Sequence, residues 1–430
     1  MNNKLWQSLA NAWRIPDLRT KLLFTAGMVA IYRFGAYVPV PGIDITALKQ
    51  FFDEGGAGVV GFLDLFSGGA LSRVAVFALG IMPYITASII MQLLTVVIPK
   101  LEELAKEGEQ GQKQITKYTR WLTVALSLVQ SFGYIVLFRQ YNALPDLNWW
   151  RAALIVSSLV AGAVIVMWLG ELITARGIGN GMSIMIFISI VSSIPSGAAQ
   201  LFTSSLVAIL LFAVIALAVV VGVIWITTGE RRIPVQYAKR VVGRRMMGGQ
   251  STFIPLKVNM AGVIPVIFAS SVMMIIPTFA QFLGTSGVGG WFTRTFGPST
   301  FVFIVFEAIL IIIFTYFYTA VTFNPIDQAD NLKKYGGFIP GVRPGRPTAE
   351  YLDRILTRLT FPGALFLASL AVLPWLLSRP PINLPFYFGG TSLLIIVGVA
   401  MDTVQQVESQ LIMRHYDGFM KKARIRGRRG

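Results

Sequence analysis

Long runs without a charged residue constrain this chain more than any other feature of its sequence. Residues 177–229 are 53 consecutive uncharged positions, and 26 uncharged residues separate Arg73 from Lys100. A membrane-spanning helix needs about 20 consecutive apolar residues. Only 13% of the chain is charged and 54% is hydrophobic, whereas soluble domains are about 25% charged. These runs therefore predict an integral membrane protein.

The spacing of the charged residues predicts ten membrane-spanning segments. The 53-residue uncharged run is too long for one span, and we expect a turn at residues 194–197, Ile-Pro-Ser-Gly, to divide it. The predicted spans are residues 22–40, 75–98, 119–138, 152–172, 182–199, 203–226, 258–280, 300–323, 359–377 and 387–407.

Ten spans divide into two halves of five, residues 1–200 and 201–408, followed by a basic tail at 409–430. Because five is an odd number, the second half enters the membrane from the opposite face, which permits an inverted repeat with a pathway between the halves. The halves show no convincing sequence identity, so this expectation concerns topology only. The expected fold class is an all-α polytopic membrane protein.

The basic residues predict the orientation of the chain. Of the 37 lysines and arginines, 30 lie in the N-terminal segment, the tail, and the loops near 99–120, 174–182, 227–257 and 324–358. Basic loops stay in the cytoplasm. We therefore expect both termini and the long loops to be cytoplasmic.

A short apolar segment at residues 61–74 precedes the second span. It contains Asp64 and Arg73 and is interrupted by Gly68 and Gly69, so it is too short and too broken to span a membrane. Its backbone groups would lack partners in lipid, and such segments lie within protein or line a water-filled cavity. We expect a half-helix inside a cavity, which is typical of a conduit.

Several chemistries are excluded by composition. The chain has no cysteine and a single histidine, His415 in the tail, which leaves no thiolate or histidine site within the spans. Nucleotide-binding and hydrolase motifs are missing from the sequence. Glu307 is the one acid deep in a predicted span, and a hydrogen-bonded interior carboxyl is its simplest interpretation. We therefore expect no enzymatic activity, no metal and no cofactor.

Two pairs of isoleucines lie on single helix faces. Ile81 and Ile85 are four residues apart in the second predicted span, and Ile186 and Ile190 repeat this spacing in the fifth. A ring of apolar side chains can block water and ions by dewetting. Ordinary helix packing produces the same spacing, and the spacing alone does not choose between them.

Several long motifs, in order along the chain, resemble the SecY family. They are FALGIMPYITASIIMQLL at 77–94, RGIGNG at 176–181, YAKR at 237–240, PLKVNMAGVIPVIFASS at 255–271, GVRPG at 341–345 and FGGTSLLIIVGVAMD at 388–402. The resemblance extends from about residue 11 to the tail. It implies a protein-conducting channel with ten spans around an hourglass-shaped pore.

The resemblance also implies roles for individual residues. A pore ring corresponds to six isoleucines: Ile81, Ile85, Ile186, Ile190, Ile267 and Ile395. A plug that fills the outer funnel corresponds to residues 61–74, with Phe62, Leu63, Leu65, Phe66, Ser67, Gly68, Gly69, Leu71 and Arg73. A lateral gate lies between spans two and three and spans seven and eight, with Thr86, Gln130 and Ser271 as polar contacts.

The partners implied are those of the family in the bacterial plasma membrane. They are SecE, SecG, the motor ATPase SecA, the ribosome, signal sequences, nascent polypeptides, membrane lipids, SecDF and YidC. The docking residues implied for SecA and the ribosome are Arg343, Arg346, Arg240, Arg244 and Arg245. Ile326 stands where many relatives carry a basic residue, so no partner contact is expected there. Topological retention by charge is the alternative role of the basic loops.

The expected function is passage of unfolded secretory polypeptides across the membrane and release of transmembrane segments sideways into lipid. Two other classes stay open from the residues alone. A secondary transporter shares the inverted halves, although paired titratable groups at mid-membrane are missing from the sequence. A membrane scaffold would use the basic loops only to recruit partners.

Overall fold

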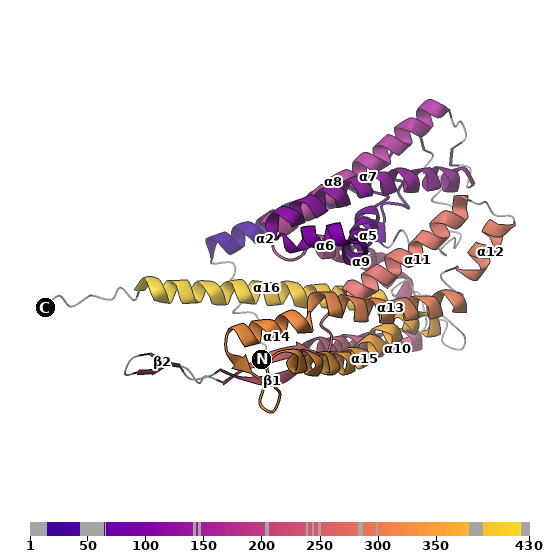
Figure 1. Ribbon diagram of the computed structural model, residues 1–430. Coiled ribbons are helices and arrows are strands. Elements are labelled where there is room, and N and C mark those ends of the chain that lie inside the picture. Colours follow the sequence, from indigo (N-terminus) through magenta and orange to yellow (C-terminus); the bar gives the residue numbers. More distant parts are fainter. Residues whose placement is uncertain are drawn as a thin grey trace. The chain divides into compact units, whose positions relative to one another are not determined.

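The chain folds mainly into helices (Figure 1). The computed structural model describes residues 15–43, 64, 66–140, 143–144, 148–202, 206–237, 240–242, 245–247, 251–282, 287–297, 300–377 and 390–422. The chain divides into two compact units, which are described separately. The first contains Met1–Ser196, Thr278–Gly290 and Val399–Gly430, and the second contains Gly197–Pro277 and Trp291–Gly398.

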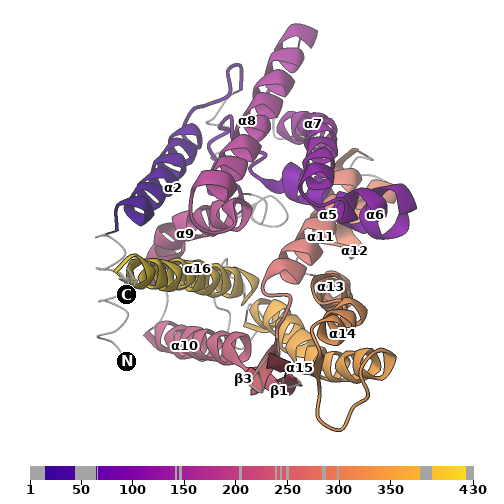
Figure 2. The ribbon, with the colours of Figure 1, turned by 60° about the vertical axis from the view of Figure 1, so that its left-hand side comes forward.

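Six helices lie within residues 16–202. Helix α7 is the longest of them and packs against both α5 and α8 (Figure 2). Helix α2 also packs against α8. The helices are α2 (Pro16–Gly35), α5 (Met82–Val97), α6 (Pro99–Lys106), α7 (Glu109–Gln140), α8 (Trp149–Arg176) and α9 (Gly181–Phe202).

The later part of the chain carries seven further helices, with a small sheet after the first of them. The most extensive helix packing there is between α13 and α15. The helices are α10 (Leu206–Thr228), α11 (Ile264–Phe282), α12 (Val288–Thr295), α13 (Phe301–Thr322), α14 (Pro325–Lys334), α15 (Arg346–Leu377) and α16 (Gly390–Lys422). Of these, α16 begins in the second unit and continues into the first.

Each of the ten predicted spans overlaps a helix, and the chain is a multi-span membrane protein. Within the described residues, five helices are long and apolar enough to cross a membrane, or six if the bent pair α5 and α6 is one span. The five are Glu109–Arg139, Trp149–Arg176, Ile209–Thr228, Phe301–Lys334 and Arg346–Leu373. The full count of ten remains a prediction.

The predicted half-helix is helical at residues 64, 66 and 67 but ends there, earlier than residue 74, and the second span starts later than predicted. Residues 68–81 form successive turns, and helix α5 begins only at Met82. Gly68, Gly69 and Gly80 have φ angles of 69°, 79° and 56°, in the left-handed region that interrupts a right-handed helix. Helix α5 is therefore only 16 residues long, and α6 follows it at a bend of 101°.

The turn predicted at residues 194–197 is wrong. Helix α9 continues through Pro195 to Phe202. Proline fixes φ near the helical value and removes one backbone donor, so it can remain within a helix when neighbouring groups satisfy the freed carbonyl. The separation from α10 falls at residues 203–205, outside the described residues.

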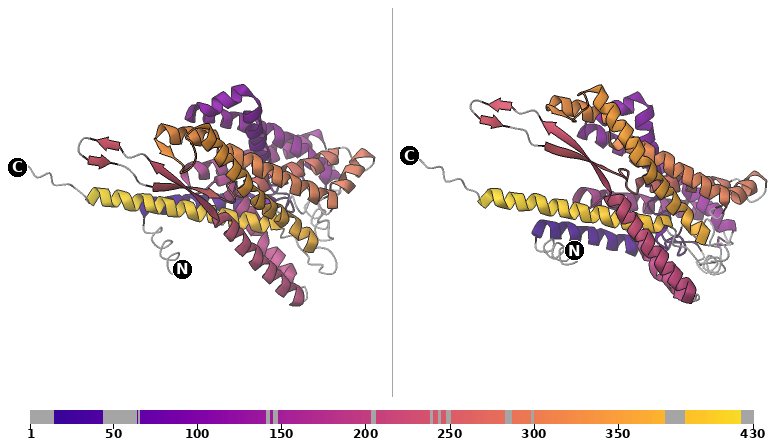
Figure 3. Two further views of the ribbon diagram at one scale, coloured as in Figure 1. Left: turned by 60° about the horizontal axis from the view of Figure 1, so that its bottom comes forward. Right: turned by 90° about the horizontal axis from the view of Figure 1, so that it is seen from below.

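The chain is mostly helical, as expected, but it is not purely all-α, because the predicted basic loops contain strands. Strand β1 (Glu230–Tyr237) pairs in antiparallel fashion with β4 (Ser251–Lys257) and with the short β5 (Gly337–Phe338), giving the order β4–β1–β5. Strands β2 (Arg240–Val242) and β3 (Arg245–Met247) form a second antiparallel pair beyond them (Figure 3).

A hydrophobic cluster joins the sheet to the helices around it. Ile233 and Val235 of β1 and Leu256 of β4 are buried against residues of α14 and α15. The alternation of Ile233 and Val235 with exposed neighbours follows the two-residue period of a strand. The cluster consists of Ile233, Val235, Leu256, Phe323, Leu332, Ile339, Leu352, Ile355 and Leu356. Two predicted loops, 227–257 and 324–358, therefore share one core.

Glycines allow the turns at residues 68–81 to pack closely in the first unit. A Cβ atom on Gly162 of α8 would lie 2.0 Å from the carbonyl oxygen of Val76. A Cβ atom on Gly35 of α2 would lie 2.0 Å from the ring of Phe77, and that ring stacks on Tyr32 at 5.9 Å between centroids. The turns thus contact both α2 and α8 at positions that exclude side chains.

Replacing Gly162 by alanine should lower the stability of the protein, because the added methyl group requires α8 or the turn at Val76 to move. Overpacking of this kind costs typically about 1–3 kcal/mol. Thermal unfolding of the purified protein in detergent, followed by tryptophan fluorescence, measures the effect. Gly27→Ala on α2 is the matched control, since no atom lies within 4 Å of its added Cβ. Equal Tm values for the two variants would contradict the close approach.

Candidate functional site

The described part of the predicted plug, residues 64 and 66–74, passes from helix into a turn after Ser67 and supplies some of its own hydrogen-bond partners. The Asp64 carboxylate accepts a hydrogen bond from the Ser72 amide at 2.9 Å, and the Ser67 hydroxyl accepts one from the Leu71 amide at 3.1 Å. The Asp64 carbonyl accepts a bond from the Gly69 amide. These bonds replace the hydrogen bonds that a helix would provide.

Side chains of α2 and α9 bind the same turn through its carbonyl oxygens. Tyr32 of α2 donates to the Ser67 carbonyl at 3.3 Å, and its hydroxyl also contacts the Ser189 hydroxyl of α9. Arg33 and Ser192 both donate to the Gly68 carbonyl, at 3.1 and 3.3 Å. The turn is therefore held between two helices that are far apart in sequence.

The end of the turn is fixed by a short backbone pairing. The Val40 amide donates to the Val74 carbonyl at 2.8 Å, and the Val76 amide donates to the Val38 carbonyl at 2.9 Å. Val74 itself has a φ of 51°, which is a strained conformation for a β-branched residue. The strain favours a change of the Val74 backbone conformation, so contacts such as the bond from the Val40 amide must hold Val74 in place.

Burial separates the predicted plug residues into groups. Phe66, Ser67 and Leu71 are buried, whereas Arg73 lies with its guanidinium 4.2 Å from the centroid of the Tyr37 ring. Gly68 and Gly69 supply the left-handed turn. The predicted residues Phe62, Leu63 and Leu65 lie outside the described residues, as does Gly61.

All six predicted ring isoleucines are buried. Four belong to the first unit, namely Ile81, Ile85, Ile186 and Ile190, and the other two, Ile267 and Ile395, belong to the second. A Cβ atom on Gly170 of α8 would lie 3.7 Å from the Ile81 side chain and 2.7 Å from the sulfur of Met182. Met182 and Ile81 therefore both lie beside Gly170. Met182 is not among the predicted ring residues, all of which are isoleucines.

The predicted gate residues lie on three helices. Thr86 of α5 and Ser271 of α11 are buried, and each donates its hydroxyl hydrogen to the carbonyl one turn earlier in its own helix. Gln130 of α7 is partly buried. The two buried hydroxyls belong to different compact units.

Helix α7 carries a row of buried hydroxyls that the sequence analysis also missed. Four of them recur at intervals of four residues, and each donates to a carbonyl of the preceding turn. They are Thr119, Thr123, Ser127 and Ser131. The regular spacing could have revealed this row, because residues four apart share one helix face.

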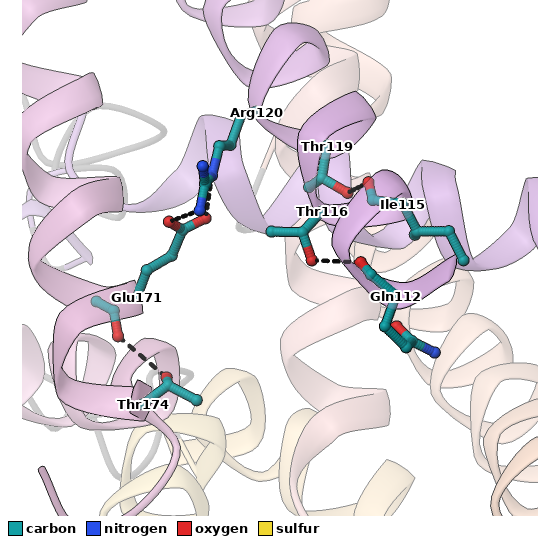
Figure 4. Close-up of polar contacts among 8 residues, drawn as sticks. Gln112, Ile115, Thr116, Thr119, Arg120, Glu171 and Thr174 are labelled. Atoms are coloured by element: carbon teal, nitrogen blue, oxygen red, sulfur yellow. Dashed lines mark hydrogen bonds and ion pairs between the residues drawn. The ribbon is translucent and has the colours of Figure 1, made fainter. Parts of the chain in front are cut away.

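An ion pair joins α7 to α8 (Figure 4). Arg120 donates from Nε and Nη2 to the two carboxylate oxygens of Glu171, at 2.9 and 2.7 Å. This two-pronged geometry fixes orientation as well as distance. Three residues later, the Thr174 hydroxyl accepts a bond from the Gly181 amide, at the start of α9. The arrangement connects three consecutive helices.

Glu307 is a hydrogen-bonded interior carboxyl, as its simplest interpretation predicts. It is buried on α13 and forms a side-chain hydrogen bond with Ser270 of α11. Among the described residues, no group of three or more acids and histidines could hold a metal ion.

The predicted docking arginines lie on the strands, on the loop after β5 and at the start of α15. Arg343 and Arg346 are exposed. Arg343 lies on the loop, which is anchored where Ile339 and Val342 pack in the hydrophobic cluster, and Arg346 is the first residue of α15. The Thr348 hydroxyl donates to the Arg343 carbonyl at 2.8 Å. Arg240 and Arg245 lie on the paired strands β2 and β3, and Arg244 lies outside the described residues.

Ile326, where the sequence departs from many relatives, lies in the first turn of α14. Its side chain is 64% exposed, and its amide donates to the Asn324 side chain that caps the helix. The structure therefore gives this isoleucine a surface position next to a satisfied helix terminus.

Comparison with solved structures shows the fold. The structure of a protein-conducting channel matches with a TM-score of 0.62 at 18% identity, covering 92% of this chain and 93% of that chain. A second structure, concerned with the plug domain of the SecY protein and the closed state of its translocation channel, matches with a TM-score of 0.63 at 19% identity, covering 92% of each chain. Sec61 in a canine ribosome–channel complex matches with a TM-score of 0.58 at 17% identity, covering 92% and 93%.

Comparison of sequences shows the family. The protein translocase subunit SecY of Streptomyces scabiei is 49% identical over 434 residues, covering 96% of this chain and 99% of the relative. The corresponding subunit of Mycobacterium bovis is 50% identical, covering 95% and 98%. A family model described as SecY matches residues 75–404. The chain therefore belongs to the SecY family of protein translocase subunits.

Proposed function

We propose that this chain forms the pore through which unfolded secretory polypeptides cross a bacterial plasma membrane. As a member of the SecY family it is a protein-conducting channel subunit and not an enzyme. The observation that carries the mechanism is the non-helical turn that begins at residue 68 in this membrane protein. Side chains of α2 and α9 bind the carbonyls of Ser67 and Gly68 at its start. Such a segment is tolerated only within protein or beside a water-filled path.

The proposed architecture has ten spans in two inverted halves around an hourglass-shaped pore. The overlap of each predicted span with a helix supports the count, and the distribution of lysine and arginine supports cytoplasmic termini. Energy comes from outside the chain, because its sequence contains no nucleotide-binding motif.

The seal has two proposed layers. Six isoleucines form an apolar ring that excludes ions by dewetting and fits around a moving polypeptide, and Met182 beside Ile81 is a candidate seventh member. The turn at residues 64–74 is the plug that covers the ring in the resting channel. Burial of Phe66 and Leu71 supports a seated plug.

The lateral gate is proposed to open between α5 and α7 on one side and α11 and α13 on the other, releasing transmembrane segments into lipid. A signal sequence opens it by binding the open state more tightly than the closed state, since a ligand shifts an equilibrium only by that difference. Thr86, Gln130 and Ser271 are the proposed polar contacts of this gate.

The proposed partners dock on the sheet and the loop after it. SecA or the ribosome would meet Arg343 on a loop anchored by the hydrophobic cluster and Arg346 at the start of α15, together with Arg240, Arg244 and Arg245. Arginine suits acidic side chains and phosphate because its planar head donates two parallel hydrogen bonds. SecE, SecG, SecDF and YidC complete the proposed set of partners.

Deleting residues 63–74 should raise the ion conductance of the resting channel, because the deletion removes the plug and leaves only the ring. Planar-bilayer recording of the purified complex measures the conductance. The double variant Phe66→Ala/Leu71→Ala, which removes two buried plug side chains, should leak as well. Phe34→Ala on the exposed face of α2 is the control. Unchanged conductance in the deletion variant argues against a plug.

Charge reversal in Arg343→Glu should slow SecA-driven export by about ten-fold or more, because an arginine that meets an acidic or phosphate group becomes repulsive. Transport of a secretory precursor into vesicles measures the rate at matched channel content. Arg294→Glu, an exposed arginine of α12, is the control. Normal export by the Arg343 variant removes this residue from the docking surface.

Cysteines at Thr86 and Ser271 should form a disulfide that holds the gate closed, provided that the two positions meet across it. The wild-type chain contains no cysteine, so the bond is read directly by its effect on gel mobility and on export before and after reduction. Cysteines at Thr86 and Ser189, which both lie within the first unit and do not bridge the proposed gate, are the control pair. Absence of the bond under oxidation excludes this pairing.

A further inference from the structure

Arg33 is a charged residue of α2 to which the proposed function gives no role of its own. Its guanidinium donates from Nη1 to the Gly68 carbonyl at 3.1 Å and from Nη2 to the Tyr37 hydroxyl at 3.4 Å. The side chain is partly buried. Tyr37 also lies beneath the Arg73 guanidinium, so one ring contacts an arginine of α2 and an arginine of the plug.

The Gly68 carbonyl is a shared acceptor for two helices. Ser192 of α9 donates to it at 3.3 Å, alongside the bond from Arg33. A Cβ atom on residue 68 would lie 3.0 Å from the Ser192 hydroxyl and 3.1 Å from the Ser189 backbone. The missing side chain of Gly68, together with its φ of 69°, allows this carbonyl to be held closely by both helices.

The Gly68 carbonyl is a neutral acceptor, which suits a hydrogen bond that breaks when the plug leaves its seat. A guanidinium bonded to a neutral carbonyl forms a charge-assisted hydrogen bond, which is stronger than a neutral bond. Breaking it leaves no buried carboxylate without a partner, unlike the separation of a buried ion pair. The bond can therefore hold the turn at rest and still permit its release.

We propose that Arg33 is a positioning residue that latches the plug to α2 through the Gly68 carbonyl, with Tyr32 and Ser192 as supporting donors. The inference rests on the proposed function, because it assumes that residues 64–74 leave their seat when the channel opens. The latch acts on a backbone carbonyl and is thus independent of the plug side chains.

Replacing Arg33 by glutamine should raise the resting conductance and should permit export of a precursor with a defective signal sequence. Loss of one charge-assisted bond is expected to increase the unseated fraction by about ten-fold. Arg33→Lys retains a donor that can reach one acceptor, and its effect should be smaller. Arg139→Gln, an exposed arginine near the end of α7, is the matched control.

Combining Arg33→Gln with deletion of residues 63–74 separates a latch from a structural role. If Arg33 acts through the plug, the combined variant conducts no more than the deletion alone and has the same Tm. An additional loss of stability or a further rise in conductance in the combined variant overturns the proposal.

The same recordings distinguish failure of the latch from failure of the plug. A leaking deletion variant with a tight Arg33→Gln channel overturns the latch and leaves the plug intact. A deletion variant that does not leak overturns both. Leak in the Arg139→Gln control equal to that of Arg33→Gln also overturns the latch, because it shows a general effect of lost positive charge.

Discussion

Hydrogen bonding of the non-helical turn between α2 and α5 is the constraint on which the first compact unit depends. Backbone groups removed from water need partners, and a turn cannot supply all of them from its own backbone. Asp64 and Ser67 supply partners from within the turn. Tyr32 and Arg33 of α2 supply the others. Polar residues of α2 and α9 are thus committed to one short segment.

Close approach is the second consequence of this constraint. The carbonyl of Gly68 can be held by two helices because no side chain intervenes, and the turn at Val76 reaches α8 because Gly162 has none either. In a membrane, helix packing gains little from the hydrophobic effect, so van der Waals contact at small residues contributes a large share. The glycines therefore act as contact points.

The sequence predicted the helices better than their ends, for physical reasons. Charge spacing locates the spans because charged residues are costly in the hydrocarbon core. It does not locate the start of α5, since Gly80 ends the turns without any change in polarity. Pro195 was read as a turn although helix α9 contains it. The alternation of Ile233 and Val235 is typical of a strand. It is short and follows basic residues, so the charge pattern alone predicts a loop there. Contacts such as Arg33 with Gly68 depend on tertiary packing and could not be predicted from spacing.

The energetics of the turn favour a seat that can be released. Val74 holds a left-handed conformation that costs a non-glycine residue roughly 1–2 kcal/mol, and the pairing with Val38 and Val40 keeps it there. Arg33 and Ser192 bind a neutral carbonyl, so their separation exposes no unpaired acid. The backbone strain at Val74 favours release of the turn, whereas the hydrogen bonds to the Gly68 carbonyl hold it in place. Because these opposing contributions are of similar size, a small difference in binding free energy from a signal sequence is enough to move the equilibrium, whereas a turn held by buried ion pairs would require a much larger one.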